Sequence, residues 1–259
     1  YYLYVLTGDF LQWTAFGIGV YVICNWIHGL KNRDPVAFLL IFKSKALLLG
    51  LLSFPFITFV TYALGAFGPS FYIRHFSMTA TEVGIIYGLI TVFGSMIGVI
   101  CGGILGDKLR ETYVNGKLYL IMASAVLTGV TAIGFIHSEN LVASFTWKFV
   151  YHIASTAWLG CAASTVTELV LPRLRAVASA FFILMLSMIG LALGPYLTGM
   201  VSDIYINSGL LPGPALKNAM TLTLVVLVLP FGLLAVACKY LKNDEAEIYE
   251  KARSLGEEI

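Results

Sequence analysis

Long apolar stretches separated by short polar connections fill most of the chain. A helix needs roughly 20 apolar residues to cross the hydrocarbon core of a bilayer, and seven stretches meet this length. They cover residues 10–29, 47–73, 81–106, 117–137, 142–170, 174–202 and 218–241. Strands of an outer-membrane barrel are shorter and alternate between apolar and polar residues. The pattern therefore predicts an all-α polytopic membrane protein.

Turn-forming residues mark the connections between these stretches. Asn115-Gly116 and Pro212-Gly213-Pro214 are examples. Thr79 with Glu82 fits a capping box that opens the third span. Connections this short favour one helical bundle over two separate domains.

The composition adds one conclusion, namely the environment in which the protein folds. Hydrophobic residues make up 59% of the 259 residues and charged residues 12%, whereas soluble domains carry about 25% charged residues. A lipid bilayer is therefore the expected environment and partner. A net charge of +2 gives no reason to expect nucleic acid.

The four cysteines lie within apolar runs, without a CxxC pair or a histidine cluster. This arrangement favours apolar packing, so we predict no metal site, disulfide or cofactor. Motifs of hydrolases, of metalloproteases and of phosphate-binding loops are absent as well. The chain is therefore not expected to be an enzyme.

Lysine and arginine residues gather in alternate connections. One set, with the C-terminal tail, carries Lys31, Arg33, Lys43, Lys45, Lys108, Arg110, Lys117, Arg173, Arg175, Lys239, Lys242, Lys251 and Arg253. The opposite set carries only Arg74 and Lys217. Because cytoplasmic loops are enriched in cations, we expect the first span to run inward in the cell membrane and the C-terminus to be cytoplasmic.

Glycines recur along the third span. They are Gly84, Gly88, Gly94, Gly98, Gly102 and Gly106. Residues four apart share a helical face, so this face carries almost no side chains and permits close approach by a partner helix. Two uses remain open, a fixed packing face and a sliding surface in a protein that rocks.

Two charged residues lie at helix ends where the dipole has the same sign as the charge. Asp107 follows the third span, where the helix dipole is negative, and Arg175 lies in the first turn of the sixth span, where it is positive. Each charge is tolerable in water. Each is also explained if it meets an oppositely polarised helix end elsewhere.

The segments around these charges resemble a known family. The run from Gly103 through Gly106, Asp107 and Lys108 to Arg110 is similar to the Gly-x-x-x-Asp-Arg/Lys loop of the major facilitator superfamily. A longer stretch, Leu171–Asp203, resembles the penultimate helix of bacterial spinster-like transporters. The matching positions are Arg175-Ala176, Ala178, Ala180, Gly194-Pro195, Gly199 and Ser202-Asp203.

The resemblance implies the C-terminal half of a twelve-helix transporter, a six-helix bundle of the major facilitator fold plus the preceding helix. On it, residues 1–30 are the helix that ends the N-terminal bundle, 31–46 a cytoplasmic linker, 47–241 the C-terminal bundle and 242–259 a cytoplasmic tail. The N-terminal bundle, a partner, would lie outside this sequence. The resemblance makes Gly103, Gly106, Asp107, Lys108, Arg110 and Arg175 a cytoplasmic gate.

This sequence departs from the family at two places. The motif's usual later glycine is Arg110, and a Gly-Pro pair in the fifth span is replaced by Gly160-Cys161. The first departure affects the gate and the second removes an expected kink.

The fifth span carries ionisable residues within the membrane, which are functional candidates by default. Lys148 and His152 share a face, with Trp147 and Tyr151 beside them, and Tyr62 is a candidate on the second span. Lys148 either snorkels to the headgroups or pairs structurally, or it lines a polar cavity. We expect Glu168, at the end of this span, to pair with Arg173 or Arg175.

These residues favour a secondary transporter of a small amphiphilic or lipid-like solute, with an anionic headgroup suited to Lys148. The alternatives are a major facilitator exporter of drugs, sugars or organic anions, an enzyme acting on lipid, and a non-transporting membrane scaffold.

Overall fold

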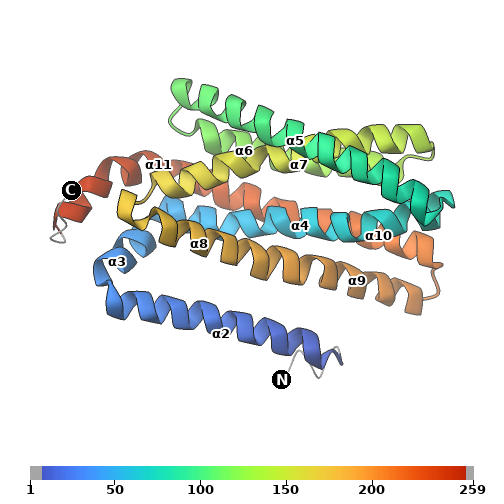
Figure 1. Cartoon of the computed structure of the whole chain (residues 1–259), viewed down its shortest axis with the longest axis horizontal. Helices are drawn as coiled ribbons and strands as arrows, with labels where there is room; N and C mark the ends of the chain where they lie inside the picture. Colours follow the sequence, from blue (N-terminus) through green and yellow to red (C-terminus); the bar gives the residue numbers. More distant parts are fainter. Residues whose placement is uncertain (1–7, 255–259) are drawn as a thin grey trace.

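The computed structural model describes residues 8–254, and over that range the chain is built from helices without strands. Figure 1 shows the long helices lying side by side, with their connections at the two ends of the molecule. The elements are α2 (Phe10–Arg33), α3 (Pro35–Lys43), α4 (Lys45–Phe76), α5 (Ala80–Thr112), α6 (Gly116–His137), α7 (Leu141–Glu168), η1 (Pro172–Leu174), α8 (Arg175–Met185), η2 (Leu186–Leu191), α9 (Ala192–Asn207), α10 (Pro212–Thr223), η3 (Leu224–Leu227) and α11 (Val228–Ser254). The predicted all-α fold is confirmed.

Six helical segments in the described part of the chain are long and apolar enough to cross a membrane. They are α2, α4, α5, α6, the segment from η1 to α9, and the segment from α10 into α11. The remaining predicted span, α7, has 28 residues but is less apolar, since it carries Lys148, His152 and several Ser and Thr residues. It lies between α5 and α6, with which it makes its most extensive contacts.

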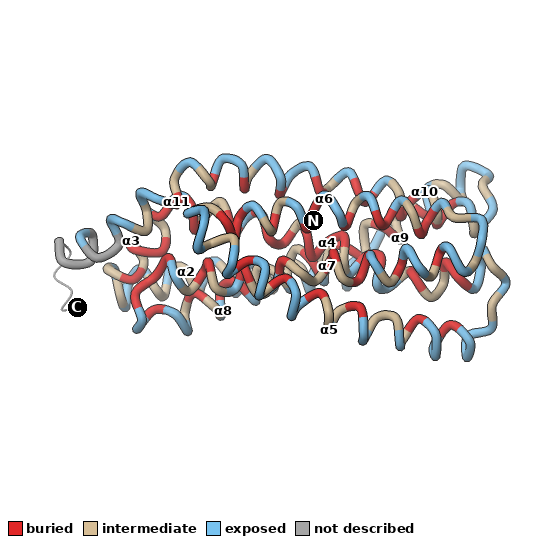
Figure 2. The backbone as a smooth tube through the Cα atoms, turned by 90° about the horizontal axis from the view of Figure 1, so that it is seen from above, coloured by how far each residue is buried: buried red, intermediate tan, exposed pale blue. Residues whose placement is uncertain are grey.

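The core follows the centre of the bundle, around α4. Two clusters of buried side chains divide it along the long axis. One joins Phe54 of α4 to Trp158 of α7 and Phe182 of α8; the other joins Tyr72 to Phe135 of α6. Figure 2 shows α5 and α6 with many exposed positions on their outer sides. Apolar exposure of this kind suits a bilayer.

The glycine face of α5 meets α7 over half its length. A Cβ added at Gly98 or Gly102 would collide with the α7 backbone at Ile153 or Ala157, and one added at Gly106 would collide with Cys161 Sγ. Gly84 and Gly88, in contrast, have nothing within 4 Å of such a Cβ. The predicted close approach is therefore confirmed for Gly94 to Gly106 only, and its partner is a helix of the same bundle.

The sixth span contains a feature that its sequence did not predict. Between α8 and α9, η2 is a π-helical turn, and the Ala192 N–H bonds back to the Ser187 carbonyl. The glycine within it, Gly190, lies against Thr58 of α4, where a Cβ would collide with the hydroxyl. The π turn thus lies where this span packs closely against α4, and the contact continues at Gly194, where an added Cβ would collide with the Phe59 carbonyl.

The connections divide between the two ends of the bundle as their charge predicts. Figure 1 shows the α2–α3, α5–α6 and α7–α8 connections at the end where α11 finishes, and the α4–α5, α6–α7 and α9–α10 connections at the opposite end. The first end holds the cation-rich connections. Most of the segment 31–46 is helical here, and Ala37, Leu40 and Ile41 of α3 are buried in the core.

The α5–α7 contact predicts opposite effects for two glycines of the same helix. Gly102→Ala forces a methyl group into the α7 backbone, and overpacking of this kind lowers the unfolding temperature by roughly 3–10 °C. Gly88→Ala places the same methyl group in open space and gains helix propensity, so the temperature stays or rises. Thermal unfolding of the detergent-solubilised variants measures both. Equal effects at the two sites would contradict the close contact.

Candidate functional site

The sequence-predicted gate residues begin at the end of α5. Gly106 lies against Cys161 of α7, which fixes the last turns of α5 on the bundle. The next residue, Asp107, keeps 75% of its side chain exposed, and its Oδ1 lies 3.7 Å from the Lys117 Nζ in the first turn of α6. The opposite helix end that Asp107 meets is thus within this chain.

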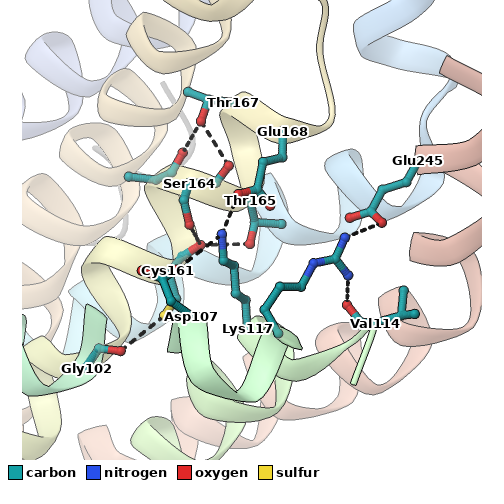
Figure 3. Close-up of polar contacts among 12 residues, drawn as sticks. Gly102, Asp107, Val114, Lys117, Cys161, Ser164, Thr165, Thr167, Glu168 and Glu245 are labelled. Atoms are coloured by element: carbon teal, nitrogen blue, oxygen red, sulfur yellow. Dashed lines mark hydrogen bonds and ion pairs between the residues drawn. The ribbon is translucent and has the colours of Figure 1, made fainter. Parts of the chain in front are cut away.

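Lys117 joins three helix ends. Its side chain is only 8% exposed, and its ammonium group forms a short ion pair with Glu168, at the end of α7, besides the longer one with Asp107. Figure 3 shows Lys117 with Asp107 and Glu168 around it. All three charges oppose the dipole of the helix that carries them. Since the cation lies between the two acids, the ion pairs offset the unfavourable position of all three charges.

The predicted pairing of Glu168 with Arg173 or Arg175 is wrong. Glu168 pairs with Lys117 because the chain turns away after α7 and directs Arg173 to the α2–α3 connection, where Nη1 lies 2.6 Å from Asp34 Oδ2. The hydrogen bond from Arg173 holds the pKa of Asp34 below its ordinary value, with a further contribution from the Ala37 N–H. The Asp34–Arg173 pair links α3 to η1.

Arg110 also has partners that its sequence did not indicate. Its guanidinium group donates to the Val114 carbonyl and, at 2.5 Å, to Glu245 Oε2 of α11. Figure 3 labels both acceptors, Val114 and Glu245. Lys108 and Arg175 are exposed, and within residues 8–254 neither forms an ion pair. The structure therefore brings Asp107 and Arg110 to one end of the bundle but does not join Arg175 to them.

Lys148 is fully buried, so snorkelling to the headgroups is wrong for this conformation. Its Nζ has no hydrogen-bond partner. Three aromatic rings enclose it instead, with centroids 4.8 Å away at Tyr87, 4.3 Å at Phe135 and 4.4 Å at Tyr151. Cation–π contacts reach about 2 kcal/mol each when desolvated, which offsets part of the cost of burying an ammonium group.

His152 lies beside this aromatic cage. Its Nε2 is 3.1 Å from the Thr91 hydroxyl, and that hydroxyl donates its proton to the Tyr87 carbonyl at 2.8 Å. Because a threonine has one hydroxyl proton, the contact requires His152 Nε2–H as donor. The ring thus ties α7 to α5.

The five cavity candidates do not form one site. Lys148, Tyr151 and His152 are buried together, whereas Tyr62 and Trp147 are each 42% exposed. The Trp147 ring covers Gly134 of α6, where an added Cβ would collide with it. Contact between a solute and the buried three therefore requires a different conformation.

A cavity of about 580 Å³ lies at the opposite end from Asp107, and sequence reasoning missed it. It is lined by Asp9, Phe67, Pro195, Tyr196, Gly199, Met200, Asp203, Ile204 and Asn207. The Tyr196 hydroxyl donates to Asp9 Oδ2 at 2.7 Å. The volume is typical of small-molecule sites, and the lining combines polar and apolar side chains.

Comparison with known proteins finds relatives of this chain. No protein-family model matches the chain. It is 30% identical over 201 residues to a protein named MFS-type efflux pump from Mycolicibacterium smegmatis, covering 76% of this chain and 45% of that protein. It is 26% identical to Protein spinster of Drosophila melanogaster, covering 62% of this chain and 28% of that protein.

The fold is shared with a solved structure, a bacterial homolog of the human lysosomal transporter spinster in an inward-facing and occupied conformation. The TM-score is 0.68 at 22% identity, covering 78% of this chain and 50% of that one. The chain thus spans half or less of the length of each of these three proteins.

The two buried lysines give a matched pair of predictions. Lys148→Met replaces an unpaired ammonium group by an apolar side chain of similar length, so we expect the free energy of unfolding to stay within about 1 kcal/mol or to rise. Lys117→Met leaves Asp107 and Glu168 without their cation, and since both acids are partly in water, the loss of the two ion pairs lowers the free energy of unfolding by about 0.5–2 kcal/mol. Chemical denaturation in detergent compares them. A loss at Lys148→Met as large as at Lys117→Met would contradict the absence of an anionic partner.

Proposed function

We propose that this chain, whose sequence and fold match a spinster-like transporter of the major facilitator superfamily, forms the C-terminal bundle of a secondary transporter that works by alternating access. The observation that carries the proposal is the exposed charge at the bundle's cation-rich end. Asp107 keeps 75% of its side chain exposed there besides its contact with Lys117. Arg175, in the first turn of α8, is exposed as well. Ionic groups so placed are available to the helix ends of a second bundle.

Helix α2 supports a second bundle independently. None of its residues is buried, and it exposes apolar side chains such as Leu11, Ile18 and Tyr21. Figure 1 shows α2 along the edge of the molecule, beside α8 and α9. We assign residues 1–30 to the helix that ends an N-terminal bundle, 31–46 to the linker, 47–241 to the C-terminal bundle and 242–259 to a tail. Parts 1–7 and 255–259 lie outside the described residues.

The charge distribution orients the protein. Its cation-rich end is assigned to the cytoplasm by the excess of Lys and Arg, which gives a cytoplasmic C-terminus and, with the membrane spans, a cell-membrane location. Asp107 and Arg175 then act on the cytoplasmic side. In alternating access, two bundles rock about a central site, and contacts between their cytoplasmic ends favour the state closed to that side.

The solute is assigned as amphiphilic or lipid-like. The 580 Å³ cavity offers carboxylate and amide groups beside Phe67, Met200 and Ile204, and the buried Lys148 offers a cation once its aromatic cage opens. We assign the anionic headgroup of the solute to Lys148, with Tyr151 and His152 beside it. The exposed candidates are Tyr62 of α4 and Trp147 of α7.

A second candidate is an exporter of drugs, sugars or organic anions. The name of the Mycolicibacterium smegmatis relative, an efflux pump, favours it. The two candidates share the fold and the gate and differ in the solute, so transport assays with defined solutes separate them.

Asp107→Asn tests the gate in the full-length protein. Loss of the carboxylate charge removes a helix-end interaction worth roughly 0.3–1 kcal/mol, so cysteine labelling of the central cavity from the cytoplasmic side rises about two- to fivefold. Glu111→Gln, at an exposed acid on the last turn of the same helix, is the control and leaves labelling unchanged. Unchanged labelling in Asp107→Asn itself would contradict the gate role.

Lys148→Met tests the solute in liposomes that contain the full-length protein. A charge-assisted contact is worth roughly 1.5–3 kcal/mol, so transport of an anionic amphiphile falls about tenfold or more, while a neutral amphiphile of equal chain length is transported as before. Equal losses for both solutes would show that Lys148 does not contact the headgroup.

A further inference from the structure

The polar end of α11 contacts two separate parts of the bundle. The helix continues to Ser254, well beyond its apolar part. Two consecutive acids, Asp244 and Glu245, point to different neighbours: Asp244 to the beginning of α4, and Glu245 to the end of α5. The segment Cys238–Glu245 is called the α11 strap below.

Asp244 holds the strap to the beginning of α4. Its Oδ2 accepts hydrogen bonds from the Ala46 N–H at 2.8 Å and the Ser44 hydroxyl at 2.9 Å. Ser44 is itself the N-cap of α4 and accepts from the Leu47 N–H. An acid at a helix N-terminus satisfies backbone donors and meets the positive end of the dipole. The Lys45 ammonium group adds a contact over the Tyr240 ring, 4.8 Å from its centroid.

Glu245 holds the strap to the last turn of α5, which precedes the connection to α6. Its Oε2 lies 2.5 Å from Arg110 Nη2, and the two side chains are 21% and 29% exposed. The same guanidinium group donates to the Val114 carbonyl, inside that connection. One residue further, the Asn115 amide donates to the Cys238 carbonyl of α11 at 3.1 Å. Three contacts thus fix residues 110–115 to the strap and to one another.

We propose that Glu245 is a positioning residue for the gate, acting through Arg110. By fixing the Arg110 guanidinium group, it holds the α5–α6 connection, and hence Asp107 and Lys117 on either side of it, in the geometry described above. Asp244 fastens the strap to α4, directly after the segment assigned to the linker. The strap therefore contacts the linker side of the bundle and the gate through two separate residues. This inference rests on the proposed function only in that the segment around Asp107 is taken to be a gate.

Hydrogen–deuterium exchange in the full-length protein tests the positioning role directly. Glu245→Gln removes the charge of the pair with Arg110, so amide exchange of residues 110–117 rises roughly three- to tenfold, while residues 44–48 keep their rate. Asp244→Asn is the matched control from the adjacent residue: it raises exchange at residues 44–48 and leaves 110–117 unchanged. A general loss of stability would instead raise both regions in both variants.

A charge exchange keeps the test decisive if single variants fold poorly. Arg110→Glu alone places two acids together and raises exchange of residues 110–117, whereas Arg110→Glu combined with Glu245→Arg restores it to within about twofold of the original. Unchanged exchange in Glu245→Gln, or a folded double variant without restoration, would overturn the proposal. Because exchange needs no solute, a protein that shows these changes yet transports nothing would refute the proposed function and leave the positioning role standing.

Discussion

The close contact between α5 and α7 is the constraint on which the rest of the structure depends. Gly98, Gly102 and Gly106 let the two backbones approach until no side chain fits between them. Packed surfaces of this kind are not continuously deformable, so α5 and α7 act as one unit. The ends of both helices carry acids, Asp107 and Glu168, and the contact brings both within reach of Lys117. A fixed packing face, rather than a sliding surface, fits this part of α5.

Charges at the ends of the helices are neutralised by contacts between different elements. Lys117 joins α5, α6 and α7, Arg110 joins α5 to α11, and Arg173 joins η1 to the α2–α3 connection. Lys148 contrasts with them, since aromatic rings from α5, α6 and α7 surround it in place of acids. The bundle end is therefore held together by ion pairs between side chains. In the interior, opening of the aromatic cage would expose the Lys148 ammonium group.

The sequence predicts the fold well because the spans depend on local information. Apolar runs locate the helices, and the capping box of Thr79 and Glu82 is confirmed at the beginning of α5. The π turn at η2 was not predictable in the same way, since it depends on how Gly190 meets Thr58 of another helix. Gly84 and Gly88 repeat the motif of Gly98 and Gly102 without a neighbour, because periodicity gives the face of a helix and not the extent of its partner.

The candidate site was predictable only in part. Asp107 stands out by its position against the helix dipole, but its contact with Lys117 depends on the α5–α6 turn and on the register of two helices. The cations nearest to Glu168 along the chain are Arg173 and Arg175, and sequence separation therefore favours the wrong partners. Glu245 had no local signal at all, since its partner Arg110 is 135 residues away.

We propose that this bundle, with α5 and α7 fixed to each other, moves as one body against a second bundle, and distances between spin labels test this motion most directly. Labels at Glu111 of α5 and Ala163 of α7 report on the bundle itself, and a label at Glu111 with one at the cytoplasmic end of the other bundle reports on its motion. The account predicts that solute shifts the second distance distribution between two populations and leaves the first unchanged. A solute-dependent change within the α5–α7 pair, with no change between bundles, would contradict it.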